Sequence, residues 1–225
     1  MAAGEKLRIA VPGNGEVSAL LVRPPTARWL LVLGHGAGAG MTHPFLESLA
    51  KELAEGGVAT LRYQFPYIEE RRRVPDKPEV LISTVAAAID RARETAPELP
   101  LLAGGKSMGG RMTSQASAQG LLEPVKGLVF FGFPLHPPSR PGTKRAEHLA
   151  KVNVPMLFLQ GTRDTLADLA LLRPICEELG SRATLHVIPE GDHSFHVLKK
   201  AGKTDAEVIK ELAKATRAWA AKLND

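Results

Sequence analysis

The sequence predicts an α/β protein with a doubly wound, mostly parallel sheet and helices on both faces. Apolar runs and amphipathic stretches alternate regularly along the chain, as expected of strands that alternate with helices. The run from Trp29 to Leu33 is continuously apolar, which is typical of a strand buried on both faces of a parallel sheet. No internal repeat, linker or low-complexity tract interrupts the pattern. We therefore expect a single domain over residues 1–225.

The composition allows a sizeable core and argues against a nucleic-acid partner. Of 225 residues, 44% are hydrophobic but only 5% are aromatic, so Leu, Val and Ala must fill most of the core. The formal net charge is +5, but basic residues are scattered among acidic ones, and Arg71 to Arg73 directly follow Glu69 and Glu70. A mild preference for anionic ligands is the most that this charge supports.

One cysteine, Cys176, excludes an intrachain disulfide, and its place on the apolar face of an expected helix predicts a small core residue. The first residues, Met1 to Lys6, contain no apolar signal region, and no apolar run approaches membrane-spanning length. These features predict a cytoplasmic protein that does not associate with membranes.

The first third of the chain predicts an edge hairpin followed by strand–helix units. Residues 7–11 and 17–22 are expected to form two antiparallel strands, because Pro12 to Gly15 is a strong turn signal. A strand over 29–33 leads into the glycine-rich loop 34–40. A helix over 44–55 follows, and Gly56-Gly57 ends it.

The rest of the chain continues the alternation of strands and helices. We expect strands over residues 58–61, 101–103, 125–131, 154–159 and 183–188. We expect helices over residues 78–95, 111–119, 145–150, 166–179 and 205–222, with Pro174 kinking the fourth.

Gly105-Lys106-Ser107-Met108-Gly109 fits the G-x-S-x-G pattern of a nucleophile elbow. Small residues two places either side of the serine let a strand and a helix approach closely at a sharp turn. The serine oxygen then stands clear of both elements. A glycine-rich turn with an incidental serine is the alternative, but the expected strand before this stretch and the helix after it favour the elbow.

Ser107, Asp164 and His193 follow one another in the order that a nucleophile, an orienting acid and a base take in this architecture. Serine is a weak nucleophile unless a base takes its proton, and a third group must fix the tautomer of that base. Each residue comes just after an expected strand, at the edge of a parallel sheet where ligands bind. Asp168 and His196 are weaker alternatives, because Asp168 lies a turn further along, inside the helix, and His196 lies further from its strand.

The loop 34–40 suits the binding of a developing negative charge through backbone N–H groups. It lacks the G-K-[ST] of a phosphate loop and the acidic residue of a dinucleotide fingerprint. We expect the N–H groups of Met108 and Ala37 to form an oxyanion hole, and His35 to hold the loop in shape. No group of His, Asp and Glu has metal-ligand spacing, so we expect neither a metal nor a cofactor.

Arg62 ends an expected strand, and Tyr63, Phe65 and Tyr67 follow it closely. This arrangement predicts one fixed positive charge in an aromatic pocket, so Arg62, Tyr63 and His35 are candidate substrate-binding residues. A guanidinium there would hold a carboxylate or phosphate. The alternative is that Arg62 pairs with an acid such as Glu69 and anchors its loop.

The chain resembles the α/β-hydrolase superfamily over nearly its whole length, and its size fits the dienelactone hydrolase-like branch. Four blocks, at residues 33–38, 62–67, 104–111 and 160–164, look most like KANL3/Tex30-type hydrolase-like domains. The resemblance implies an eight-stranded hydrolase sheet and an acyl-transfer triad of Ser107, Asp164 and His193. The segment after residues 125–131, where many lipases insert a lid, is short here, which implies a minimal lid.

These features together predict a serine hydrolase of small ester or thioester substrates, possibly anionic, with no cofactor. Two alternatives remain at this stage: a non-catalytic hydrolase-like interaction module and a small peptidase. The acyl group, the leaving group and the oligomeric state stay open.

Overall fold

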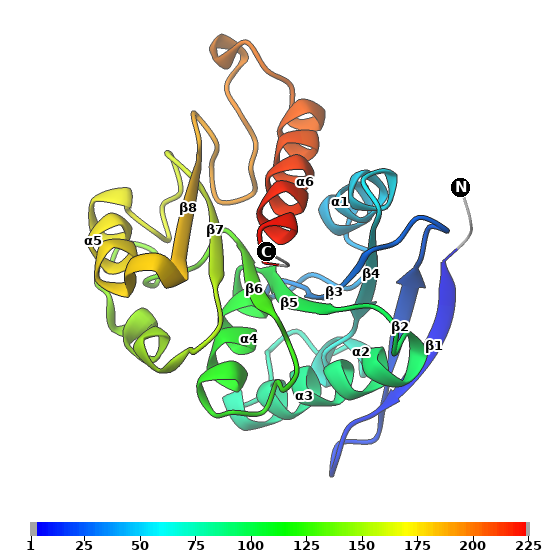
Figure 1. Ribbon diagram of the computed structural model, residues 1–225. Helices are drawn as coiled ribbons and strands as arrows, with labels where there is room; N and C mark the ends of the chain where they lie inside the picture. The colour runs from blue at the N-terminus through cyan, green and yellow to red at the C-terminus, as the bar shows by residue number, and fades with distance from the viewer. Residues whose placement is uncertain (1–3, 224–225) are drawn as a thin grey trace.

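The computed structural model describes residues 4–223, which form one eight-stranded sheet with helices packed on its two faces. The spatial order of the strands is β1-β2-β4-β3-β5-β6-β7-β8 (Figure 1). The strand bounds are β1 Glu5–Ala10, β2 Glu16–Val22, β3 Trp29–Gly34, β4 Val58–Tyr63, β5 Leu101–Lys106, β6 Gly127–Phe131, β7 Met156–Gly161 and β8 Ala183–Ile188.

The predicted edge hairpin is confirmed. β1 and β2 pair antiparallel, β2 pairs antiparallel with β4, and every other neighbouring pair from β4 to β8 is parallel. Parallel strands need helical crossovers, and these lie on both faces of the sheet. The carboxyl ends of β3 to β8 therefore meet along one edge, where the loops carry the candidate site.

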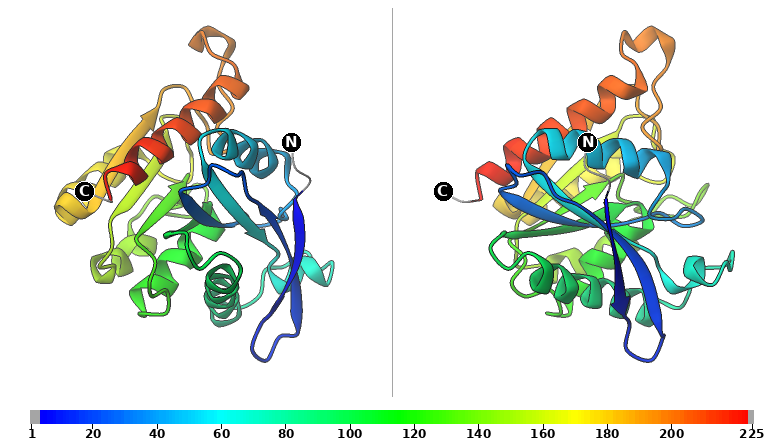
Figure 2. Two further views of the ribbon diagram at one scale, coloured as in Figure 1. Left: turned by 45° about the vertical axis from the view of Figure 1, so that its right-hand side comes forward. Right: turned by 90° about the vertical axis from the view of Figure 1, so that its right-hand side faces the viewer.

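Two hydrophobic cores lie on opposite faces of the sheet, under the helices that Figure 2 shows on each face. One face is covered by α1 (Pro44–Glu55) and α6 (Asp205–Ala221), which pack against each other as well as on the strands. The other face is covered by α3 (Pro78–Thr95), α4 (Met108–Ala118) and α5 (Leu169–Leu179). Strands β3, β4, β6 and β7 are buried along their whole length. For β3, the continuous apolar run from Trp29 to Leu33 predicts this burial.

Local sequence signals explain where the helices start. Thr204 and Glu207 form a reciprocal capping box at the start of α6. Asp168 caps α5 by accepting a hydrogen bond from Ala170 N–H, so α5 begins at Leu169 rather than at the expected residue 166. Cys176 is buried on α5, and burial raises the pKa of its thiol to about 11. The core position predicted for this residue is confirmed.

Two features differ from the expected pattern. A four-residue helix, α2 (Pro66–Glu69), lies in the segment after β4, where the sequence predicted no helix or strand. The expected helix near residues 145–150 is a 3-10 helix, η1 (Lys144–Lys151), and it is the one helical element described between β6 and β7.

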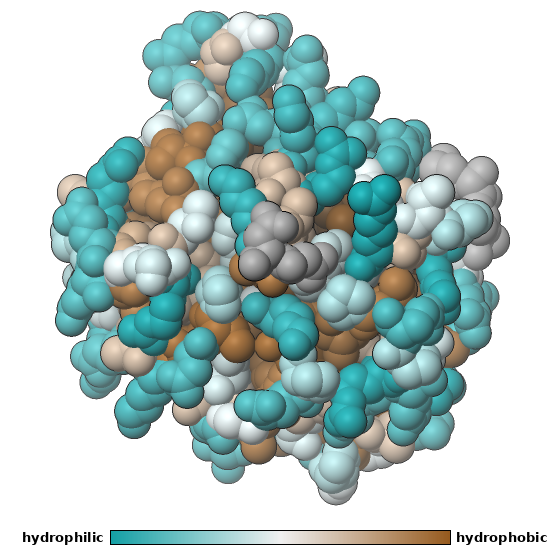
Figure 3. All heavy atoms as spheres, in the orientation of Figure 1, coloured by the Kyte–Doolittle hydropathy of each residue, from teal (hydrophilic) through white to brown (hydrophobic). Residues whose placement is uncertain are grey.

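Polar residues cover most of the surface in Figure 3, and apolar residues show mainly in the gaps between them. Amphipathic helices produce such a surface, because their charged sides face water. Within residues 4–223, every helix is too short or too polar to cross a membrane.

Candidate active site

Ser107 stands at a sharp turn between β5 and α4. Its φ is 51°, a left-handed conformation that non-glycine residues rarely adopt. The flanking glycines are required by close packing: a Cβ on Gly105 would lie 2.5 Å from Gly34 O, and one on Gly109 would lie 2.5 Å from Gly34 C and O. The small residues of the G-x-S-x-G pattern thus let α4 pass directly over the end of β3, and the turn has the geometry expected of an elbow.

The structure brings Ser107, His193 and Asp164 into one hydrogen-bonded row. His193 Nε2 lies 2.8 Å from Ser107 Oγ, and His193 Nδ1 lies 2.7 Å from Asp164 Oδ2. The carboxylate can only accept, so Nδ1 carries the hydrogen and Nε2 is free to accept the hydroxyl proton of Ser107. The Asp164 side chain is 1% exposed, whereas that of His193 is 22% exposed. Ordered donors rather than water therefore surround the acid.

Three donors fix the Asp164 carboxylate. Leu166 N–H donates to Oδ1 at 2.8 Å, while Oδ2 accepts hydrogen bonds from both His193 and Gln160 Nε2. Gln160 is fully buried, and its Oε1 accepts a hydrogen bond from Phe133 N–H at 3.0 Å. Sequence reasoning gave Gln160 no role, although it lies next to the last residue of β7, four residues before Asp164.

The two alternative residues lie outside this row. Asp168 caps α5, as described above. His196 Nδ1 lies 2.6 Å from Asp205 Oδ2 at the start of α6, and this contact raises the pKa of His196. The geometry therefore favours Asp164 and His193 as the partners of Ser107.

A second serine–histidine contact has the wrong hydrogen positions for catalysis. Ser114 Oγ lies 2.7 Å from His148 Nε2 and 2.8 Å from Arg111 O. Because a carbonyl oxygen can only accept, the Ser114 hydroxyl donates to Arg111 O, and His148 Nε2 must carry a hydrogen. Such a nitrogen cannot take a proton from Ser114. No described carboxylate hydrogen-bonds to His148, and burial lowers its pKa to about 4.

The glycine loop and the start of α4 present backbone donors beside Ser107. Ala37 is exposed in the loop after β3, and Met108 is the first residue of α4. Neither N–H group bonds to another backbone group within residues 4–223. The first N–H groups of a helix lack intrahelical partners, so that of Met108 is available to a ligand.

The segment 62–67 holds the glycine loop in place rather than lining a substrate pocket. Four hydrogen bonds join this segment to the loop 34–40 and to Met41, which directly follows the loop. They are Phe65 N–H to His35 Nε2 at 3.1 Å, Gly38 N–H to Tyr67 Oη at 3.1 Å, Met41 N–H to Gln64 Oε1 at 2.9 Å, and Arg62 Nη1 to Met41 O at 2.8 Å. Two of these bonds hold the loop itself, and the other two hold its C-terminal end at Met41.

The expected substrate contacts of Arg62, Tyr63 and His35 are therefore corrected. These residues are 4%, 1% and 0% exposed, and none of them lines the pocket. Arg62 anchors its loop, as the alternative prediction stated, but its partners do not include Glu69. They are Met41 O and, at 3.9 Å, Glu47 Oε1. Glu69 instead binds Arg8 and Ser18. Tyr63 lies beneath the loop, and burial raises the pKa of its hydroxyl.

The role predicted for His35 as a loop support fits its contacts. Its Nδ1 lies 2.8 Å from Gly36 O, and its Nε2 accepts the hydrogen of Phe65 N–H. A carbonyl on one side and an N–H on the other demand the neutral ring with its hydrogen on Nδ1. Burial lowers the pKa of His35 to about 4, so this form persists at neutral pH.

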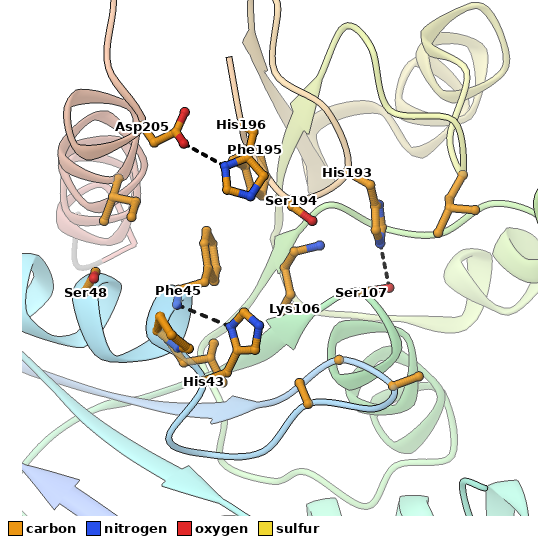
Figure 4. Close-up of a pocket in the computed structure, with 17 residues that line it drawn as sticks. His43, Phe45, Ser48, Lys106, Ser107, His193, Ser194, Phe195, His196 and Asp205 are labelled. Atoms are coloured by element: carbon orange, nitrogen blue, oxygen red, sulfur yellow. Dashed lines mark hydrogen bonds and ion pairs between the residues drawn. The ribbon is translucent and has the colours of Figure 1, made fainter. Parts of the chain in front are cut away.

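A pocket of about 650 Å³ opens beside Ser107 and His193. Ser107 and His193 lie on one side of it, and Phe45 from α1 and Phe195 from the loop after His193 form an apolar wall across from them (Figure 4). The two rings stack at 5.7 Å with an interplanar angle of 12°. Sequence reasoning missed both rings, and also Lys106, which lines the pocket next to the serine.

No residue of segment 132–155 lines this pocket, so the described part of the β6–β7 connection leaves it uncovered. Within residues 4–223, no three His, Cys, Asp or Glu residues lie together in a way that could hold a metal ion.

The whole fold is shared with known hydrolase structures. At 23% identity and a TM-score of 0.76, 97% of the chain aligns with 97% of a dienelactone hydrolase from Anabaena variabilis. A Xanthomonas campestris protein described as an α/β serine hydrolase without lid aligns at 21% identity, with a TM-score of 0.75 and coverage of 97% and 96%. Est1E from Butyrivibrio proteoclasticus aligns at 16% identity, with a TM-score of 0.71 and 99% of each chain covered. At these levels of identity, the three alignments show a shared fold.

The family itself follows from the sequence match that accompanies this fold. Residues 27–221 match the family described as "Alpha/beta hydrolase domain", a span that runs from the start of β3 to the end of α6. It includes the elbow, the glycine loop and both partners of Ser107. With the eight-stranded sheet and the hydrolase neighbours in agreement, this chain belongs to the alpha/beta hydrolase family.

Proposed function

We propose that this protein is a serine hydrolase that cleaves small ester or thioester substrates through an acyl-enzyme intermediate. The observation that carries the proposal is the continuous row from Ser107 Oγ through His193 to Asp164 at a strained elbow, beside an open pocket. The nucleophile is within hydrogen-bond reach of the base, and the base is within hydrogen-bond reach of the orienting acid.

In the proposed reaction, Ser107 Oγ attacks the substrate carbonyl as His193 Nε2 takes its proton. His193 then gives that proton to the departing alcohol or thiol, and an acyl-serine remains. A water molecule then attacks the acyl-serine while His193 Nε2 takes its proton. His193 returns the proton to Ser107 Oγ as the carboxylic acid is released. Asp164 keeps the hydrogen of His193 on Nδ1 and stabilises the imidazolium that forms.

The N–H groups of Met108 and Ala37 are proposed to bind the oxyanion of the tetrahedral intermediate. Their lack of backbone partners within the described chain and their position beside Ser107 support this role. A crystal structure with a phosphonate bonded to Ser107 tests the assignment. Its oxygen should lie within hydrogen-bond reach of Met108 N and Ala37 N, and an oxygen directed away from both would exclude the proposed hole.

Labelling with a fluorophosphonate tests the function, with turnover of 4-nitrophenyl esters as the second readout. Ser107→Ala should abolish labelling and lower kcat by about 10⁴-fold, as loss of a triad member does. Ser114→Ala is the matched control, because Ser114 also contacts a histidine but with the wrong hydrogen positions. If wild-type protein is neither labelled nor active, the alternative of a non-catalytic interaction module replaces this proposal.

The base is tested in the same way. His193→Ala should abolish labelling, whereas His196→Ala should leave it in place, because His196 pairs with Asp205 at the pocket rim. The opposite pattern would transfer the role of base to His196. Within the family, we propose a relationship to KANL3/Tex30-type domains, on the four sequence blocks at residues 33–38, 62–67, 104–111 and 160–164.

A further inference from the structure

Lys106 directly precedes Ser107, and its side chain enters the pocket rather than leaving the protein. Figure 4 shows it between the aromatic wall and the Ser107–His193 pair. The ammonium lies over the ring of Phe195, with Nζ 5.7 Å from the ring centroid. A lysine at this depth is unusual, because an ammonium normally reaches bulk water or an acid.

No described residue forms a hydrogen bond or an ion pair with the Lys106 ammonium. The two acids close enough to favour its charge are Asp164 and Asp192. Asp164 already accepts from Leu166, Gln160 and His193. Oδ1 of Asp192 accepts from the N–H groups of Ser194 and His196. The ammonium therefore keeps its hydrogens for a ligand.

The pocket holds no other free positive side chain among its described lining residues. Lys106 is the one lysine or arginine there, and the one carboxylate, Asp205, is already bound to His196 and to Val197 N–H. Burial lowers the pKa of Lys106 to about 8, so the group is still mostly charged at pH 7. A partly desolvated cation without a counter-ion is stabilised when an anion binds beside it.

From this geometry, and resting on the function proposed above, we infer that the preferred substrate carries a carboxylate that binds Lys106 while its ester or thioester carbonyl meets Ser107. The side chains of both residues line the same pocket, so a carboxylate bound to Lys106 would lie close to the scissile carbonyl. The stacked rings of Phe45 and Phe195 would contact the apolar part between the two groups. A half-ester of a short dicarboxylic acid has this pattern, and so does an ester of a carboxylate-bearing alcohol.

Matched esters distinguish these two sources of the carboxylate. 4-Nitrophenyl hydrogen adipate is compared with 4-nitrophenyl hexanoate, with the spontaneous rates subtracted, and the butyrate ester of 3-hydroxybenzoate is compared with phenyl butyrate. Lys106→Met should lower the anionic-to-neutral ratio of kcat/KM by about tenfold or more in the pair that matches the natural substrate. Lys106→Arg should retain most of that ratio. Lys214→Met, an exposed lysine on α6, is the control and should leave it unchanged.

An equal loss on the anionic and neutral members of both pairs would overturn the inference. It would show that Lys106 acts through the charges of Asp164 and His193, and a shifted pH profile of kcat would accompany that result. Melting temperatures of the variants separate either outcome from misfolding.

A binding measurement makes the result independent of catalysis. Calorimetry on Ser107→Ala protein compares monoethyl adipate with ethyl hexanoate, each with and without Lys106→Met. Tighter binding of the anionic ester that disappears with Lys106→Met supports the lysine contact even if wild-type protein proves not to be a hydrolase. Equal affinities in all four combinations would reject the contact even if Ser107 is the nucleophile.

Discussion

The amide of Gln160 donates a hydrogen bond to Oδ2 of Asp164, the same oxygen that accepts from His193. The Oε1 of the same amide accepts a hydrogen bond from Phe133 N–H. A single buried side chain therefore links Asp164 to the backbone that follows β6. Asp164 is thereby held at a fixed angle to the His193 ring. This makes Gln160 a positioning residue that acts through Asp164.

Gln160→Met removes both hydrogen bonds at nearly constant volume. We expect a loss of about 1–3 kcal/mol in the free energy of unfolding, because Phe133 N–H becomes unpaired, and a fall in kcat of about tenfold or more. A double-mutant cycle with Asp164→Asn checks the mechanism. If Gln160 acts through Asp164, the double variant should have nearly the kcat of Asp164→Asn alone. Fully additive losses would point to a separate role.

Arg62→Met tests the corrected role of Arg62. The variant keeps the apolar stem but leaves Met41 O without its donor, so we expect a lower melting temperature, corresponding to about 1–3 kcal/mol. Loosening the glycine loop should reduce kcat/KM for anionic and neutral esters alike. Arg28→Met, an exposed arginine before β3, is the control. A selective rise in KM for the anionic ester would restore the original prediction that Arg62 binds substrate.

The contrast between Arg62 and Lys106 shows where sequence reasoning reached its limit. Strand–helix alternation located the edge of the sheet, and the positions of Ser107, Asp164 and His193 just after strands were enough to place them together. The position of Arg62 near the end of β4 did not reveal the direction of its side chain, which the fold directs beneath the glycine loop. Lys106 occupies a position that the motif leaves open, so only the packing around it shows that it enters the pocket.

The pocket wall was unpredictable for a different reason. Phe45 and Phe195 come from segments far apart in the chain, and neither belongs to a recognisable motif. Their stacking depends on α1 lying beside the loop after β8 and on the positive φ of Phe195, 64°, which no pattern of apolar residues reveals. Gln160 is similar, since its partners are set by the pairing of β6 with β7.

Gly109→Ala tests the close approach of α4 to β3. The new methyl group would lie 2.5 Å from Gly34 C and O, which are backbone atoms and cannot move alone. We expect a loss of about 1–3 kcal/mol, the usual cost of overpacking, and a melting temperature lower by roughly 2–4 °C for each kcal/mol. Gly142→Ala is the matched control, because its Cβ would meet nothing within 4 Å. Equal melting temperatures for the two variants would contradict the tight elbow.

The stability of the protein should depend on His35 between about pH 6.5 and pH 4. The folded-state pKa of His35 is lowered to about 4 from the ordinary value of 6.5, so the unfolded chain binds a proton in this range that the folded chain does not. The resulting stabilisation of the neutral, folded form is fully present above pH 6.5 and is lost as the pH falls toward 4. Its size is on the order of 3 kcal/mol.

Two substitutions separate the titration of His35 from its hydrogen bonds. His35→Gln can still donate to Gly36 O and accept from Phe65 N–H, but it does not titrate, so its free energy of unfolding should fall less steeply than that of wild type as the pH drops from 6.5 to 4. His35→Leu loses both bonds and should be less stable at every pH, because it leaves buried backbone groups unpaired. Urea unfolding at a series of pH values measures both effects. Parallel curves for wild type and His35→Gln would mean that a group other than His35 dominates the acid dependence of stability.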